Sequence, residues 1–460
     1  MRVLLVSTYE LGHQPLHLAS TAAHLGRAGH EVITRDTSVE PLDDDAIDWA
    51  EMIAVAVPMH TAMRLAIPVV QRVRVRRGDS VTVVLYGLYA PLCRDTLGGA
   101  VDHRIGGEFE EELVAVASGA RRSRDVVLDR LQFATPRRQG LPPLERYARL
   151  VVDGEERLAG YVEASRGCVH RCRHCPVPAV YDGRIRIVQV ATLVVDVAAL
   201  RDQGARHITF GDPDFLNAVP HALATVRAVH GAFSDLTFDI TTKVEHVIEH
   251  ADVFAELRDC GLLFVTSAVE SMSGEVLRIL DKGHTPGDAD KAVHLLRSLG
   301  IALRPSLLPF TPWSDVADYL DIIDFIDGND LEDAVDPVQL SIRLLVPDGS
   351  LLLQRAEMRR HLDGYDPATL SWRWRHPNAA VDALAERVAA LVAGDVDAGV
   401  EASLSHRRIR DLAALAAADA GITWQPTTRP SSARAGAGPR LSEPWFCCAE
   451  PTTRQLTAVG

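Results

Sequence analysis

The stretch Ser165-Arg166-Gly167-Cys168-Val169-His170-Arg171-Cys172-Arg173-His174-Cys175-Pro176 decides how this chain is interpreted. It places three cysteines in the spacing Cys-x3-Cys-x2-Cys within one short loop. Thiolate is the ligand that iron–sulfur clusters take, so this loop can hold three irons of a [4Fe–4S] cluster. The fourth iron then has no protein ligand, and an open coordination position is what a catalytic metal site needs. The loop predicts a cluster bound by Cys168, Cys172 and Cys175.

Two other metal sites fit part of this pattern. Structural zinc takes four ligands, and His170 or His174 could supply the fourth. A ferredoxin-type cluster takes a fourth cysteine nearby, and the next one is Cys260. A non-catalytic zinc or iron–sulfur protein that senses metal or redox state therefore stays open as an alternative.

The composition allows a large core and disfavours some partners. The chain has 460 residues, of which 47% are hydrophobic, which is enough for two or three domains. Its formal charge of −14 disfavours a nucleic-acid-binding role, which would want a basic face, and docking on anionic lipid. Lysine occurs only at Lys243, Lys282 and Lys291, which indicates a composition bias toward arginine.

The remaining cysteines and the start of the chain indicate in which cellular compartment the protein is expected. Cys93 and Cys260 stand in ordinary segments and are expected to pack as small apolar side chains. The overall pattern is not that of a disulfide framework. The first apolar run is too short for a secretory signal, and no stretch approaches the ~18 apolar residues of a membrane span. We expect a cytoplasmic protein without a membrane partner.

The hydrophobic periodicity predicts an α/β protein in four parts. Residues 1–145 alternate strands and helices, which predicts a parallel, doubly wound domain with ligands at the carboxyl ends of its strands. Residues 146–350 follow a linker and contain six candidate strands. Six βα repeats do not easily close an eight-stranded barrel, so an open, partial barrel is expected. Residues 351–425 are helical and alanine-rich, and residues 426–460 are a flexible tail. The barrel strands are expected at 159–165, 206–211, 236–242, 262–269, 301–308 and 337–345.

The cysteine loop resembles that of the radical SAM superfamily, in which His174 fills a place that is often aromatic. In that family S-adenosylmethionine chelates the open iron through its amino and carboxylate groups. An electron from the cluster then breaks a carbon–sulfur bond and releases a carbon radical. The resemblance implies a partial (β/α)6 barrel with the cluster loop after its first strand, a small-molecule substrate, and an external electron donor of flavodoxin or ferredoxin type.

Further residues match turns that contact the cofactor in this family. Gly211, Asp212 and Pro213 resemble the Gly-Gly-Glu-Pro turn, with Asp in place of Glu. A plain acidic turn between a strand and a helix could have the same sequence. Glu270 and Ser271 resemble a Glu-Ser turn near the ribose and methionine parts of the cofactor, where a carboxylate accepts hydrogen bonds.

Two of these positions also have simpler interpretations. Ser271 could serve only as a helix N-cap. Arg304 could pair with the cofactor carboxylate or with an acid inside the barrel.

The first domain resembles the flavodoxin-like, cobalamin-binding domain that precedes many radical SAM cores. The opening strand and the turns at 28–32 and 106–110 carry this resemblance. The signature Asp-x-His-x-x-Gly is absent, because leucine stands at positions 11 and 16 around His13. His13 is therefore expected to be an exposed loop histidine, and cobalamin binding stays open.

The tail contains a second motif, Cys447-Cys448-Ala449-Glu450-Pro451. Adjacent cysteines form strained disulfides, so the pair is expected to be reduced or metal-bound, and soft thiolates suit thiophilic elements such as trivalent arsenic. The motif resembles a radical SAM family with a Cys-Cys-Ala-Glu-Pro terminus, in which some members carry selenocysteine. That family is similar to enzymes of arsinothricin biosynthesis, which transfer the 3-amino-3-carboxypropyl group of S-adenosylmethionine to arsenic.

The resemblances imply an enzyme that cleaves S-adenosylmethionine reductively, with Cys447 and Cys448 acting on the substrate. Aminocarboxypropyl transfer to arsenic is one expected reaction. Cobalamin-dependent radical methylation is the alternative within the same class.

Overall fold

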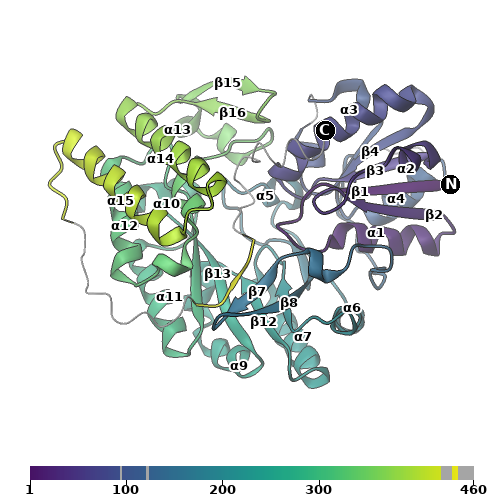
Figure 1. Cartoon of the computed structure of the whole chain (residues 1–460), viewed down its shortest axis with the longest axis horizontal. Coiled ribbons are helices and arrows are strands. Elements are labelled where there is room, and N and C mark those ends of the chain that lie inside the picture. Colours follow the sequence, from purple (N-terminus) through teal and green to yellow (C-terminus); the bar gives the residue numbers. More distant parts are fainter. Residues whose placement is uncertain (94–95, 121–123, 426–437, 444–460) are drawn as a thin grey trace.

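The computed structural model describes residues 1–93, 96–120, 124–425 and 438–443, and the predicted tail cysteines Cys447 and Cys448 lie outside these ranges. The described chain forms two α/β units side by side, followed by helices that pack on the far side of the second unit (Figure 1).

The first unit is an all-parallel sheet in the order β2-β1-β3-β4-β5-β6. The 2-1-3-4-5 order is that of flavodoxin-like folds, so the predicted doubly wound domain is confirmed. Its central strands are continuous apolar runs because both faces are covered. The elements are β1 (Arg2–Ser7), α1 (Leu16–Arg27), β2 (Glu31–Asp36), α2 (Asp44–Trp49), β3 (Met52–Ala56), α3 (His60–Arg77), β4 (Thr82–Tyr86), β5 (His103–Gly107), α4 (Glu110–Ala117) and β6 (Val126–Val127).

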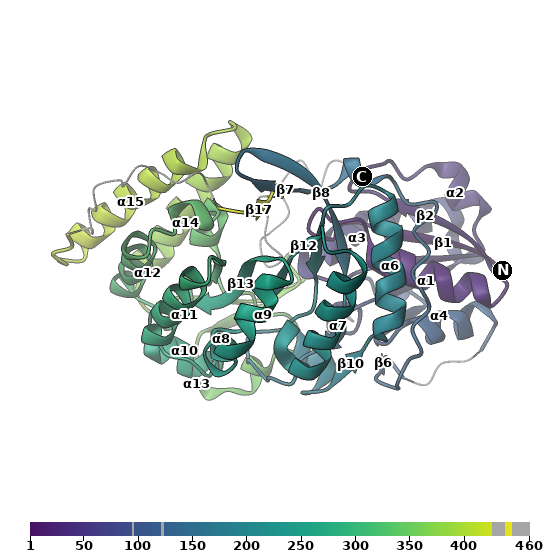
Figure 2. The same cartoon turned by 90° about the horizontal axis from the view of Figure 1, so that it is seen from below.

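The second unit is a seven-stranded sheet in the order β14-β13-β12-β11-β8-β7-β17. Five neighbouring strands are parallel, and β7 and β17 form an antiparallel edge. Figure 2 shows α6 and α7 along the outside of this sheet. The elements are β7 (Arg149–Val152), β8 (Glu155–Val162), α6 (Val190–Asp202), β11 (His207–Phe210), α7 (Val219–Ala232), β12 (Thr237–Thr241), α8 (Val244–Glu249), α9 (Phe254–Asp259), β13 (Leu262–Glu270), α10 (Gly274–Leu280), α11 (Pro286–Ser298), β14 (Ala302–Leu307), α12 (Val316–Gly328) and β17 (Arg440–Leu441).

The sixth predicted strand, at 337–345, is not a strand. Pro337–Ser341 is a 3-10 helix, because Pro337 fixes the first turn and lacks an N–H for a ladder. The segment still lies along the edge of the sheet. The Gln339 side-chain oxygen accepts a 3.1 Å hydrogen bond from the Leu307 N–H, and Phe310 pairs with Arg343 in an isolated bridge.

The C-terminal region is helical, as predicted, with one hairpin that the sequence pattern did not indicate. The hairpin consists of β15 (Leu362–Asp366) and β16 (Ser371–Trp374). Helices α14 (Ala379–Asp397) and α15 (Ala402–Asp419) follow it, and α15 packs on α12.

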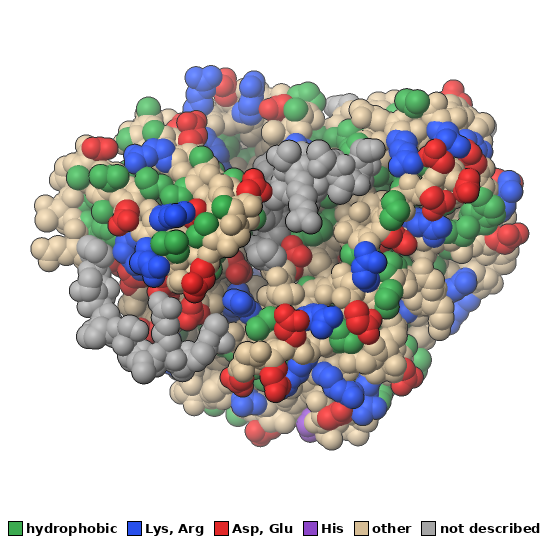
Figure 3. Space-filling model, in the orientation of Figure 1, with side chains coloured by type: hydrophobic (Ala, Val, Ile, Leu, Met, Phe, Trp, Pro, Cys, Tyr) green, Lys and Arg blue, Asp and Glu red, His purple; other side chains and the backbone are tan. Residues whose placement is uncertain are grey.

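The surface carries no single charged face in the view of Figure 3, where acidic and basic side chains are interspersed. Within the described residues, no helix has the length and apolar character needed to cross a membrane.

Candidate active site

The cysteine loop begins where β9 (Ser165–Gly167) ends and runs into α5 (Val177–Tyr181). Gly167 has a φ of 77°, and an added Cβ there would lie 2.3 Å from the Arg184 carbonyl oxygen and 2.6 Å from the Tyr181 ring. Only glycine fits this position, because other residues rarely adopt positive φ and the backbone is closely packed. The turn at Gly167 therefore directs the loop toward the sheet.

The three cysteines of the loop gather in one place. Cys168 and Cys172 are buried and Cys175 is half-buried. They lie within one tight turn, in which the Cys175 N–H donates a 3.2 Å hydrogen bond to the Cys172 carbonyl. Burial raises the pKa of Cys168 to about 11 and that of Cys175 well above its usual range. Both thiols are thus protonated without metal, and cluster binding must displace these protons.

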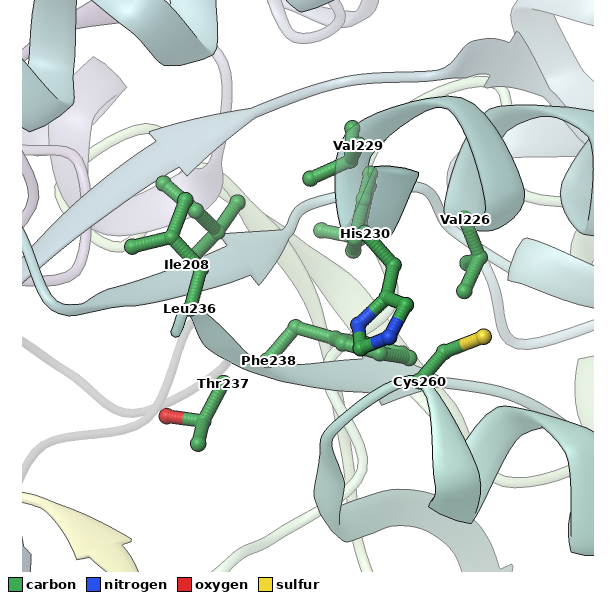
Figure 4. Close-up of a pocket in the computed structure, with 9 residues that line it drawn as sticks. Ile208, Val226, Val229, His230, Leu236, Thr237, Phe238 and Cys260 are labelled. Carbon is green, nitrogen blue, oxygen red and sulfur yellow. The ribbon is translucent and has the colours of Figure 1, made fainter. Parts of the chain in front are cut away.

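The other described cysteines lie elsewhere. Cys93 is buried in the core of the first unit. Cys260 lines a small hollow under α7 with Phe238 and His230, which Figure 4 shows. Within the described residues the loop therefore offers three thiols and no fourth, and this donor set fits a [4Fe–4S] cluster with an open iron.

Asn217 is a contact of the loop that the sequence reasoning missed. Its side-chain oxygen lies 3.5 Å from Cys168 Sγ and accepts a 3.2 Å hydrogen bond from the Val169 N–H. Its amide donates to the Gly167 carbonyl at 3.5 Å. Asn217 lies within the 3-10 helix Phe215–Ala218, and nothing in the sequence indicated this role.

The predicted turn after β11 lies directly beside the loop. Gly211 is packed against Tyr161, whose hydroxyl would be 1.9 Å from an added Cβ. The Asp212 carboxylate accepts hydrogen bonds from Ser165 Oγ at 2.6 Å and from the Ala164 N–H at 2.9 Å. Burial raises the pKa of Asp212 to about 7. The Asp212 side chain thus holds the strand that leads into the loop, while Pro213 is exposed.

Glu270 ends β13 and connects the loop to a buried lysine. Its Oε1 lies 3.1 Å from His174 Nε2 and 3.2 Å from Lys282 Nζ. Burial alone would raise the pKa of Glu270, but Lys282 and His174 outweigh it and lower this pKa to about 2. Lys282 is only 2% exposed and lies within electrostatic range of the Cys172 and Cys175 thiols. The sequence motif that follows Glu270 and Ser271 includes Lys282, but the sequence analysis gave this lysine no role.

Ser271 and Arg304 have partners within the protein. Ser271 Oγ accepts a 3.1 Å hydrogen bond from the Ser273 N–H, but the N-cap of α10 is Ser273 itself. Ser271 therefore closes a turn before the helix, and the capping alternative is wrong. Arg304 donates a 3.0 Å hydrogen bond to Asp336, which matches the alternative of an ion pair inside the barrel. Burial lowers the pKa of Arg304, and Asp336 acts against this effect.

A polar chain holds the other side of the loop. His170 Nε2 lies 3.0 Å from His246 Nε2, and His246 Nδ1 lies 3.1 Å from Asp214 Oδ1. Lys243 Nζ is 3.1 Å from His170 Nδ1. All contacts are satisfied when Lys243 donates to His170, His170 to His246, and His246 to Asp214. His170, His246 and Asp214 are close enough to hold one ion, but the Lys243 ammonium beside His170 favours the hydrogen-bond chain.

His13 is not the exposed loop histidine that was expected. It is buried, and its ring stacks on Tyr161 of β8 with centroids 4.6 Å apart. Burial lowers the pKa of His13 to about 4. The prediction of exposure was wrong because β8 of the second unit covers this loop.

The family comparison agrees with the loop and its surroundings. Residues 162–323 match the Radical SAM superfamily. The chain is also 22% identical over 170 residues to the hopanoid C-3 methylase of Methylococcus capsulatus. That match spans 37% of this chain and 32% of the methylase.

Two solved structures share the fold over most of the chain. The cobalamin-dependent S-adenosylmethionine radical enzyme OxsB, with aqua-cobalamin bound, matches with a TM-score of 0.65 at 14% identity, over 84% of this chain and 66% of OxsB. The radical S-adenosylmethionine methyltransferase TsrM from Kitasatospora setae, with cobalamin and a [4Fe-4S] cluster bound, matches with a TM-score of 0.54 at 19% identity, over 72% of this chain and 70% of TsrM. The family match assigns a radical SAM domain to residues 162–323, and the two solved structures show a shared fold.

Proposed function

We propose that this chain is an enzyme that cleaves S-adenosylmethionine reductively and uses the resulting fragment on a small-molecule substrate. The observation that carries the proposal is the gathering of Cys168, Cys172 and Cys175, without a fourth thiol from the described residues, beside the carboxyl ends of β8 and β11. When bound, the cluster supplies the electron that breaks the carbon–sulfur bond. With Cys168, Cys172 and Cys175 as its ligands, a bound cluster would keep one iron free for S-adenosylmethionine.

The residues of the chain hold and shield this site. Asp212 and Asn217 fix the two ends of the strand-to-loop turn through the contacts described above. The Glu270 carboxylate is ionised and retains its second oxygen for a ribose hydroxyl, which is the contact that we propose for it. The backbone of Gly211 and Asp212 is the proposed contact of the cofactor amino group.

The test is anaerobic reconstitution followed by addition of S-adenosylmethionine and reductant. We expect about four irons with matching sulfide per chain and an electron paramagnetic resonance signal that changes when S-adenosylmethionine is added. Replacing any one of Cys168, Cys172 or Cys175 with alanine should abolish both, while Cys260→Ala on the far side of the sheet should retain both. An unchanged spectrum in the reconstituted wild type would reject the proposal.

Zinc binding is the competing non-enzymatic proposal. A zinc ion with Zn–S distances of about 2.3 Å brings its sulfur ligands to about 4 Å from one another. Among the described residues, the sets close enough for one ion are histidine–carboxylate sets, and the cysteine triad is not one of them. His174 is also engaged with Glu270. Stoichiometric zinc in anaerobically purified protein would favour this alternative.

Cobalamin-dependent methyl transfer is a second candidate reaction. It is favoured by the flavodoxin-like first unit and by the fold shared with OxsB and TsrM, both of which hold cobalamin in their structures. The burial of His13 against Tyr161 does not fit a histidine ligand to cobalt. Cobalamin bound without such a ligand, detected by its absorbance after anaerobic purification, would support this candidate.

The tail supports a more specific proposal. We propose that Cys447 and Cys448 bind a thiophilic substrate such as trivalent arsenic, to which an aminocarboxypropyl group is transferred. Mass spectrometry of the nucleoside product separates the reactions: methylthioadenosine accompanies aminocarboxypropyl transfer, and 5′-deoxyadenosine accompanies the other cleavage. Replacing both tail cysteines with serine should spare the cluster and impair product formation.

A further inference from the structure

Lysine is rare in this chain, and its placement is uneven. Among 48 lysines and arginines, only three are lysine. Lys243 and Lys282 are buried beside the cysteine loop, whereas Lys291 is exposed on α11. In an arginine-rich chain, lysine at two buried positions around one loop indicates that a compact ammonium is required there, since the two cations are not interchangeable.

Lys282 is the one of these that is connected to the residue next to Cys175 through a shared carboxylate. It follows α10, whose last carbonyls accept hydrogen bonds from Arg173 of the loop, and it is 2% exposed. Its 3.2 Å hydrogen bond to Glu270 fixes the ammonium in this position. Glu270 is in turn bound to His174, the residue before Cys175. The lysine is therefore tied to the loop by one shared carboxylate.

The backbone at Glu270 is strained in a way that serves this contact. Glu270 has a φ of 64°, in the left-handed region, and the register of β13 with β14 shifts between Ala268 and Glu270. A non-glycine residue in this conformation costs of order 1–3 kcal/mol and persists where the surroundings require it. The residue in this conformation is the one whose carboxylate contacts both His174 and Lys282.

We propose that Lys282 sets the reduction potential of the cluster that the loop holds, with Glu270 acting against it. This inference rests on the proposed function. One electron from an external low-potential donor would convert a bound cluster from the 2+ to the 1+ state and make its net charge more negative by one. A buried cation beside the loop would stabilise the reduced state, because charges interact strongly away from water.

The proposal predicts opposite shifts for the two partners. Glu270→Gln removes a negative charge and keeps Lys282, so the midpoint potential should rise. The double variant Lys282→Met with Glu270→Gln differs from it only by the ammonium, so its potential should fall below that of Glu270→Gln. Glu270→Gln leaves the buried Lys282 ammonium without its carboxylate, whereas the double variant removes both charges. Thermal unfolding of both variants therefore accompanies the measurement of the potential.

The experiment is an anaerobic redox titration of the reconstituted variants without S-adenosylmethionine, followed by electron paramagnetic resonance. Lys291→Met, which removes an exposed ammonium, is the matched control and should leave the potential unchanged. Equal potentials in Glu270→Gln and the double variant would overturn the role of Lys282. A wild type that assembles no four-iron cluster would instead reject the proposed function, so the two failures are distinguishable.

Discussion

Single residues fix the geometry of the cysteine loop, and Gly167 is the clearest case. Replacing it with alanine forces a Cβ into contact with the Arg184 carbonyl at a φ of 77°. We expect Gly167→Ala to lower stability by about 1–3 kcal/mol and to reduce iron incorporation. Gly231→Ala in α7, where a Cβ meets open space, should be neutral or stabilising by up to about 1 kcal/mol. Thermal unfolding and iron analysis of both variants test this.

The pH dependence of stability should carry the signature of Asp212. Burial raises its pKa in the folded state from 3.8 to about 7. The folded state then binds the proton more tightly than the unfolded state, so stability falls as the pH rises from about 4 to 7. Asp212→Asn imitates the protonated acid and should flatten this dependence. Urea unfolding of the apoprotein at several pH values measures it.

Asp288 is a control, because its ionisation changes stability with pH in the direction opposite to that expected for Asp212. Hydrogen bonds from Lys291 and Thr285 lower its pKa to about 2, so its contribution is present above pH 4 and is lost as the pH falls. Asp288→Asn should therefore lower stability at neutral pH and leave the slope attributed to Asp212 intact. An unchanged slope in Asp212→Asn would contradict the assignment.

At the scale of elements, the loop is anchored to the end of α10. The Arg173 N–H donates to the Leu280 carbonyl at 2.9 Å, and its guanidinium donates to the Ile279 carbonyl at 2.7 Å. These carbonyls have no partner within the helix, and a cation at this end also interacts favourably with the helix dipole. One arginine thus joins the cluster loop to the helix that precedes Lys282.

We expect Arg173→Met to cost about 1–2 kcal/mol and to weaken retention of the cluster. Arg171→Met is the matched control on the same loop, since Arg171 is exposed and pairs only across the surface with Asp182. Unfolding by urea and the rate of iron loss to a chelator separate the two variants. Equal rates of iron loss in both would show that this anchor does not support the site.

At the scale of the whole molecule, buried charges join the two α/β units. Arg166, just before the loop, pairs with Glu110 of α4 at 2.8 Å, and Tyr181 donates to Glu108 at 3.0 Å. Burial raises the pKa of Glu108 to about 7, while Arg166 acts against this rise and the Glu110 carboxylate adds to it. The cluster loop is therefore part of the interface between the units.

Arg138 makes a second connection between the units. It forms a buried pair with Asp196 of α6 and also donates to Gln14 of the first unit and to the Tyr161 carbonyl. Arg138→Met leaves Asp196 buried and unpaired, and we expect a loss of about 3–5 kcal/mol. The double variant Arg138→Met with Asp196→Leu should recover part of that loss. A single urea transition that shifts in the first variant and partly returns in the second would confirm this, and two unshifted transitions would contradict it.

The sequence by itself determined the class of the fold and the metal-binding loop. Strand and helix periods are local properties, and three ligands within eight residues need no long-range folding to be recognised. The same local periods predicted the five parallel strands of the barrel. The prediction of a strand at 337–345 was wrong, because Pro337 begins a 3-10 helix there and the Gln339 side chain, in place of a backbone ladder, bonds to Leu307.

The tertiary structure alone decided what surrounds the loop. Asn217, His246, Glu270 and Lys282 come from different elements, and only the folding of the sheet brings their side chains to the same loop. It also decided that His13 is buried and that Arg304 is paired with Asp336. Burial and pairing are properties of the neighbours in space, and no spacing along the chain encodes them.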